Sequence, residues 1–153
     1  NWEVLPNGAD TYFGAYPNPA VQTIFSGLTY YEVLWDPGKG GNAFFKLGHQ
    51  FIAAQLNILN GADPSLVSAW MDDAASILAY YDTGANPDNT IPKRGDDWCQ
   101  TQTSGHPCFG YNSDRQYAIY LNDMLTSYNE GTLPGGPLHC DDDAQSFYGL
   151  NVE

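Results

Sequence analysis

Apolar residues recur at helical spacing in two adjacent segments, and this is the clearest pattern in the chain. In residues 43–59 the apolar positions, at steps of three and four, are Phe44, Leu47, Phe51, Ala54 and Ile58. Neighbouring apolar residues widen this stripe, so we expect a helix that is buried on several sides. Residues 64–81 repeat the spacing with Leu66, Val67, Trp70, Ala74, Ile77, Leu78 and Tyr81. The polar side of this second helix, which we expect to face water, carries Asp72, Asp73 and Ser76.

Capping residues mark the ends of both helices. Asn42 precedes the first helix as its expected N-cap, and Gly61 follows it where a left-handed residue commonly ends a helix. Asp63 and Pro64 are the cap and first-turn residues expected at the start of the second helix. So short a joint predicts an antiparallel pair of helices. Asn57, on the first helix, is expected to hold the backbone of a loop.

A third long helix is predicted after residue 113. Ser113 and Gln116 belong to a capping box, and Gly131 ends the helix. Its inward positions are Tyr117, Leu121, Met124, Leu125 and Tyr128. Residues 82–112, between the second and third helices, are rich in glycine and proline. A connection of this length inside a compact domain needs a staple.

Shorter elements are expected on either side of these helices. Asn18 and Pro19 open one short helix, and a capping box from Thr29 to Glu32 opens another. Alternating apolar residues predict a short strand at each end of the chain. We therefore expect one mainly α domain over residues 1–153, with three long and two short helices, a long stapled loop and short terminal strands. Residues 1–17 and 144–153 form its extended terminal segments.

The three cysteines suggest what the staple is. Cys99 and Cys108 lie close together in the long connection and are expected to form a disulfide in an oxidising compartment. Cys140 then stays unpaired, competes for one of the other two, or bonds another chain. The alternative is a zinc site of Cys99, His106 and Cys108, with His139 or Cys140 as the fourth ligand.

Charge narrows the range of partners. The chain has 18 acidic and 5 basic residues, a net charge of −13, which argues against binding nucleic acid or anionic lipid. No run of about 18 apolar residues occurs, so we expect no membrane insertion. Asp82, Asn86 and Asp88 place oxygen atoms at alternating positions in a loop, as calcium ligands do. The alternative for that loop is a capped, solvated turn, and no other cofactor is expected.

No pattern of residues predicts catalysis. The chain lacks the nucleophile elbow, the phosphate-binding glycine loop and the HExxH motif. His139 and Cys140 are adjacent in the chain, whereas a Cys–His nucleophile needs two groups that face each other. His49 is expected to make a structural hydrogen bond. We therefore expect no catalytic residues and no enzyme activity.

Several short motifs together resemble a helical domain of bacterial secreted and cell-surface proteins, a family without an assigned activity. The family pattern "GN…QxIAAxLNxxNGA" is matched by residues 41–42, 50–57 and 60–62, and "LTYxExL" by residues 28–34. Its ending, "YNNG…GPxHC", is matched by residues 128–131, where Glu130 departs from it, and by residues 136–140. The resemblance spans roughly residues 28–140, and the family's Cys-containing "GYWKNHP" start is missing. It implies secretion and a helical fold, and it implies that Cys140 has lost its partner if the missing cysteine normally pairs with it.

These observations predict an extracellular or cell-surface structural protein without catalytic activity. The first residues have no features of an export signal, so we expect such a signal to have been removed. We expect the chain to associate with other copies of itself, as a filament subunit joined by strand addition through its terminal segments. The residues expected at that contact are Trp2, Val4, Phe147, Tyr148, Leu150 and Val152. The alternative is a module that binds carbohydrate or cell-wall polysaccharide, assisted by calcium.

Overall fold

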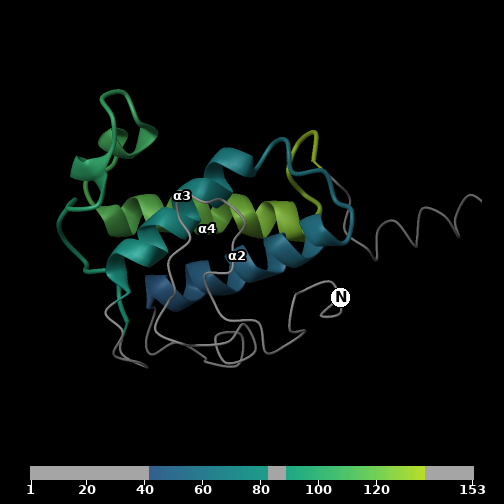
Figure 1. Cartoon of the computed structure of the whole chain (residues 1–153), viewed down its shortest axis with the longest axis horizontal. Helices are drawn as coiled ribbons and strands as arrows, with labels where there is room; N and C mark the ends of the chain where they lie inside the picture. The colour runs from purple at the N-terminus through teal and green to yellow at the C-terminus, as the bar shows by residue number, and fades with distance from the viewer. Residues whose placement is uncertain (1–41, 83–88, 137–153) are drawn as a thin grey trace, which may run out of the picture.

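The computed structural model describes residues 42–82 and 89–136, and helices dominate this part of the chain (Figure 1). The long helices are α2, Ala43–Leu59; α3, Ser68–Tyr81; and α4, Asp114–Glu130. Two short 3-10 helices, η4 (Cys99–Thr101) and η5 (Pro107–Gly110), lie in the connection between α3 and α4. The prediction of a mainly α domain is confirmed, and the described residues contain no strand. The two short helices and the terminal strands expected from the sequence fall outside the described residues.

The three long helices form an up–down–up bundle in which α2 and α4 run parallel and α3 runs the other way (Figure 1). Late residues of α2 and α4 meet, since Asn57 Nδ2 donates to Asn129 Oδ1 at 3.0 Å. Asn129 Nδ2 in turn donates to the Gln50 carbonyl at 3.0 Å and to Gln50 Oε1 at 2.8 Å. The expectation that Asn57 holds a loop is therefore wrong: it joins two helices.

The core lies among the three helices and beneath the long connection. Phe44 and Phe45 are both buried although they are adjacent, which confirms that α2 is covered on more than one side. The connection contributes Trp98, whose side chain is only 1% exposed. The bundle is filled by further buried residues: Leu47, Phe51, Ile52, Met71, Ile77, Leu78, Tyr117, Leu121 and Leu125. None of the described helices is long and apolar enough to cross a membrane.

The predicted caps of α2 and α4 are confirmed. The Asn42 side chain accepts a hydrogen bond from Phe44 N at 2.9 Å and donates to the Asn89 carbonyl at 2.7 Å. It therefore caps α2 and also holds the chain beyond α3. Ser113 Oγ accepts from Gln116 N at 3.2 Å at the start of α4. Gly131, with φ of 73°, ends α4 in the left-handed conformation.

The start of α3 differs from the prediction. Asp63 Oδ1 accepts from Ser65 N at 2.9 Å, but α3 begins only at Ser68 and its N-cap, Val67, makes no side-chain cap. Asp63 caps a separate turn, which Val67 N closes on the Pro64 carbonyl at 3.0 Å. The Asp63 carbonyl also accepts the Tyr128 hydroxyl at 2.9 Å. This contact ties the peptide before the turn to α4, and the joint between α2 and α3 is longer than the sequence suggested.

Candidate functional site

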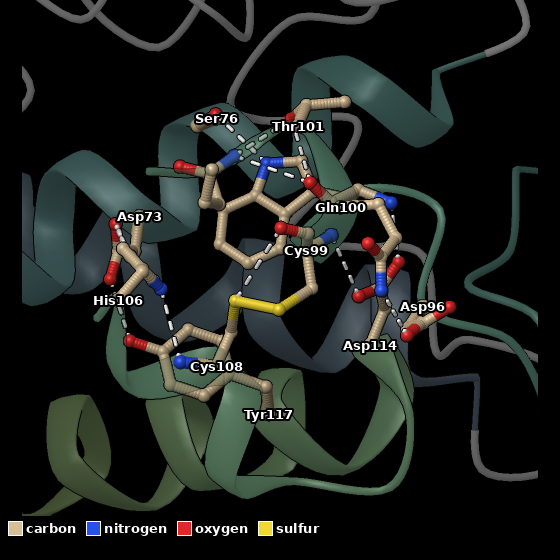
Figure 2. The surroundings of a disulfide bond; sticks show 12 residues. Asp73, Ser76, Asp96, Cys99, Gln100, Thr101, His106, Cys108, Asp114 and Tyr117 are labelled. Carbon is tan, nitrogen blue, oxygen red and sulfur yellow. Dashed lines mark hydrogen bonds and ion pairs between the residues drawn. A yellow bond between two sulfur atoms is a disulfide. The ribbon is translucent and has the colours of Figure 1, made fainter. Parts of the chain in front are cut away.

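Among the described residues, a dense group of polar and aromatic contacts surrounds a disulfide in the connection between α3 and α4 (Figure 2). Cys99 and Cys108 are bonded, with Cα atoms 5.8 Å apart, and each is 2% exposed. The predicted staple is confirmed, and the zinc alternative is wrong because both sulfur atoms are used in the bond. No group of three potential metal-ligating side chains occurs in the part of the chain that the structure describes.

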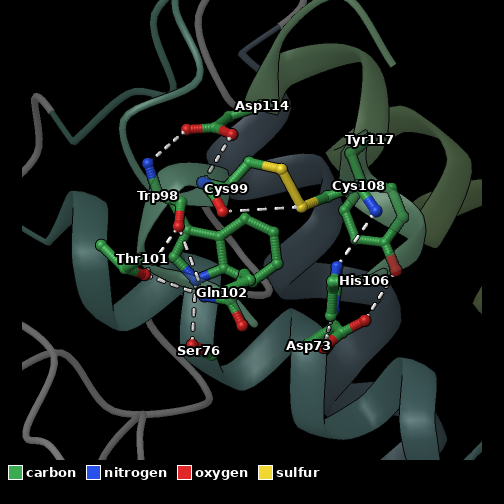
Figure 3. Close-up of polar contacts among 10 residues, drawn as sticks. All are labelled: Asp73, Ser76, Trp98, Cys99, Thr101, Gln102, His106, Cys108, Asp114 and Tyr117. Atoms are coloured by element: carbon green, nitrogen blue, oxygen red, sulfur yellow. Dashed lines mark hydrogen bonds and ion pairs between the residues drawn. A yellow bond between two sulfur atoms is a disulfide. The ribbon is translucent and has the colours of Figure 1, made fainter. Parts of the chain in front are cut away.

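Asp114, in the first turn of α4, attaches this connection to the bundle (Figure 3). Its side chain is 1% exposed, and its carboxylate accepts from Trp98 N at 2.8 Å and from Cys99 N at 3.1 Å. The Tyr81 hydroxyl, at the end of α3, donates to the same carboxylate. Hydrogen bonds to a charged acceptor are stronger than neutral ones. One buried carboxylate therefore joins η4, α3 and α4.

His106 forms the second polar attachment, on the other side of the disulfide (Figure 3). Its Nδ1 accepts from Cys108 N at 3.0 Å, so the neutral ring carries its proton on Nε2, which donates to Asp73 Oδ1 at 3.0 Å. The other carboxylate oxygen of Asp73 accepts from the Tyr117 hydroxyl at 2.6 Å. Asp73, expected on the solvated side of its helix, is instead a contact between α3, α4 and the connection.

An aspartate–histidine pair is also a common element of catalytic sites, so the state of each atom matters. A catalytic histidine uses one ring nitrogen to bond the carboxylate and keeps the other available for a substrate or nucleophile. In His106 that second nitrogen accepts the backbone N–H of Cys108 and caps η5. His106 and Asp73 thus connect the long connection to α3 and α4, and we call this group, together with Trp98, Cys99 and Cys108, the brace.

Trp98 is the aromatic centre of the brace. Its ring stacks on Tyr117, with centroids 5.8 Å apart and an angle of 17° between the planes. The His106 ring meets the rings of Trp98 and Tyr117 edge to face, at 5.5 and 5.6 Å. Trp98 Nε1 donates to Ser76 Oγ at 2.9 Å, so Ser76 also contacts the connection and does not simply face water as expected. The indole is buried with its polar atom satisfied.

A row of rings continues from this centre to the surface. Tyr117 contacts Tyr120 at 5.8 Å, and Tyr120 contacts Tyr111 at 5.5 Å. On its other side Tyr120 meets Trp70 of α3 edge to face, at 6.2 Å. Trp70, Tyr111 and Tyr120 are each half-buried. The row joins α3, α4 and the connection through apolar contact.

The buried tyrosines predict that the protein loses stability at alkaline pH. Burial, and then the hydrogen bond to Asp114, raises the pKa of Tyr81, and burial with the bond to Asp73 raises the pKa of Tyr117. A raised pKa means that the folded state holds its proton more tightly than the unfolded state does. The stabilisation is complete below the ordinary tyrosine pKa of about 10 and is lost as the pH rises above it. Urea unfolding from neutral pH upward measures this loss.

Two phenylalanine variants and one control test this alkaline effect. Tyr81→Phe and Tyr117→Phe each remove a hydroxyl that donates to a carboxylate, and we expect each to make the alkaline loss less steep. Tyr80→Phe is the control, because the Tyr80 side chain is 48% exposed. An equal pH dependence in all three variants and the wild type would contradict the prediction.

The remaining residues singled out from the sequence are only partly placed. Asp82 is the C-cap of α3, and its Oδ1 accepts from Asn89 Nδ2 at 3.1 Å. The other two predicted calcium ligands, Asn86 and Asp88, lie outside the described residues, as do Cys140 and all the predicted assembly residues: Trp2, Val4, Phe147, Tyr148, Leu150 and Val152. Sequence patterns missed Asp114, Asp73 and Trp98 because their partners are distant in the chain.

Comparisons with protein-family models, curated proteins and solved structures find no match for this chain.

Proposed function

We propose that this chain is an extracellular structural protein that associates with other copies of itself as a filament subunit. One observation carries most of the proposal: the polar groups best suited to chemistry are engaged in bracing the fold. Both carboxylate oxygens of Asp73 and both ring nitrogens of His106 have partners within the domain. The Asp114 carboxylate accepts three hydrogen bonds.

The disulfide supports an extracellular location. Disulfides persist in oxidising compartments and are rare in the cytosol. The Cys99–Cys108 bond is buried beside Trp98 and secures a connection that contains only two short 3-10 helices. The resemblance to secreted bacterial proteins points the same way. A protein braced in this manner suits a role that requires persistence outside the cell.

Self-association is proposed to occur through the terminal segments. Trp2 and Val4 at one end, and Tyr148, Leu150 and Val152 at the other, occupy alternating positions, and Phe147 adjoins Tyr148. An extended segment of this kind can add to the surface of another chain through backbone hydrogen bonds. A contact between different surfaces of identical chains produces a filament when it does not close into a ring.

Deleting residues 144–153 tests this proposal. Light scattering and electron microscopy of the purified full chain should show large particles, and the deletion should return the mass to that of one chain. Phe109→Ser is a surface control, because Phe109 is an apolar residue of η5 that is 46% exposed. It should assemble as the wild type does. A wild-type chain that stays monomeric at high concentration would refute the proposal.

A second candidate function is binding of cell-wall polysaccharide. The half-buried row of Trp70, Tyr120 and Tyr111 favours it, because aromatic rings provide apolar faces with polar edges on which sugars stack. Calcium would assist this binding if Asp82, Asn86 and Asp88 hold an ion. A monomeric chain that binds insoluble polysaccharide, and releases it on addition of a chelator, would favour this candidate over assembly.

A further inference from the structure

A pocket of about 220 Å³ opens between the first turn of α2 and the first half of α4. Ala43 and Ala118 are buried at this pocket, and Ile119 adds an apolar side chain that is 38% exposed. Lys46 is exposed and Arg115 half-exposed. The remaining lining residues are Asn122 and Asp123. The pocket therefore combines a base of small residues with two cationic side chains.

Positive charge is scarce in this chain, which makes the pairing of Lys46 and Arg115 notable. They are two of the 5 basic residues, against 18 acidic ones. Neither makes an ion pair with another of the described residues. Because α2 and α4 run parallel, the positive ends of both helix dipoles lie at this end of the bundle. Asp123 also lines the pocket, but it lies eight residues beyond Arg115, about 12 Å along α4. Its carboxylate is therefore at the other side of the pocket from the Arg115 backbone.

We propose that this pocket receives the acidic run of residues 141–143 from a second copy of the chain. These three consecutive aspartates are the only such run in the sequence, and no lysine or arginine occurs in residues 137–153. Opposite charges brought together at an interface fix its register and select the partner. The inference rests on the proposed self-association and names a surface that receives the residues directly before the terminal segment 144–153.

The place where the described residues end favours a neighbouring copy over the chain's own tail. A Cβ atom built on Gly135 would lie 3.5 Å from Leu66 Cδ1, so the described chain ends beside the turn before α3. That is the end of the bundle opposite the pocket (Figure 1). Arg115 lies roughly 22 Å along α4 from Glu130. Five to seven residues beyond Gly136 reach about 17–25 Å only at full extension, so the chain's own tail would meet the two cationic side chains only if it were almost fully stretched. Copies stacked head to tail bring the tail of one directly to the pocket of the next.

Exchanging the charges tests the pairing. One variant carries Lys46→Glu and Arg115→Glu, and the other carries Asp141→Lys, Asp142→Lys and Asp143→Lys. Each variant alone juxtaposes like charges, and we expect its concentration threshold for assembly to rise at least about tenfold. An equimolar mixture pairs each altered tail with an altered pocket and should assemble again. Light scattering measures the thresholds, and circular dichroism verifies that each variant is folded.

A matched control separates the pocket from the general effect of charge. Lys93→Glu with Arg94→Glu makes the same change in net charge at two exposed residues of the connection, and it should assemble at the wild-type threshold. If the wild type assembles and the pocket variant behaves like this control, the inference is overturned while self-association stands. If both variants lose assembly and their mixture does not regain it, the pocket and the acidic run do not pair. If the wild type itself stays monomeric, the proposed function fails first.

Discussion

Replacing Asp114 with alanine is expected to lower the free energy of unfolding by about 3–5 kcal/mol, the largest effect of any single change proposed for this protein. The substitution leaves Trp98 N and Cys99 N without their acceptor at a site that is almost completely buried. It also removes the acceptor of the Tyr81 hydroxyl. A buried donor left without a partner costs about 1–3 kcal/mol, and the effects accumulate here because one carboxylate serves three donors.

Two further variants identify the cause of the Asp114 effect. Asp114→Asn keeps one accepting oxygen but replaces the other with a donor. It should therefore lower the free energy of unfolding by roughly half as much as Asp114→Ala does. Asp123→Ala, at an exposed position of the same helix, should stay within about 0.5 kcal/mol of the wild type. Urea unfolding followed by tryptophan fluorescence measures all three. A loss below about 1 kcal/mol for Asp114→Ala would show that the carboxylate is not what holds the connection.

Removing the disulfide with Cys99→Ser and Cys108→Ser is expected to cost about 3 kcal/mol. The bond closes a loop with a sequence separation of 9 residues, for which the chain-entropy estimate is roughly 2.7 kcal/mol. Two hydroxyl groups would then occupy positions that are 2% exposed, which adds to the loss. Thermal unfolding of the double variant, compared with the wild type, measures the effect.

Reduction and a cysteine control make the disulfide experiment specific. The wild type treated with a thiol reductant under unfolding conditions should lose the same stability as the double variant. Cys140→Ser is the control for replacing a cysteine with serine, because it leaves the Cys99–Cys108 bond intact. If the double variant unfolds at the wild-type temperature, the connection is held by its hydrogen bonds and rings alone.

Asp114 and the disulfide stabilise the same short helix, so their effects should not add. Asp114 accepts from the backbone of Cys99, and Cys99 also carries the disulfide sulfur. Residues that share a partner commonly show interaction energies of about 0.5–3 kcal/mol in double-mutant cycles. η4 is therefore held at two points. The Cys99–Cys108 disulfide holds one, and the hydrogen bonds from Trp98 N and Cys99 N to the Asp114 carboxylate hold the other.

The sequence by itself determined the features that depend on neighbours in the chain. Spacing of apolar residues predicts α2 and α4, and the caps Asn42, Ser113 and Gly131 act within a few residues of their positions. The Cys99–Cys108 pairing was also accessible, because the two cysteines are close together and in the same loop. Local geometry is repeated in every helix and turn, so residue type and spacing are enough to predict it.

Only the tertiary structure decided which distant groups meet. An aspartate in the first turn of a helix is favoured by the helix dipole wherever the helix lies, so nothing local marked Asp114 as buried. Asp73 and Asn57 were likewise misplaced, because the residues that contact them come from other elements. α3 begins later than the sequence predicted, and the Asp63 carbonyl before it accepts a hydrogen bond from Tyr128 across the bundle. Such contacts depend on how the helices pack, and the pocket between parallel α2 and α4 exists for the same reason.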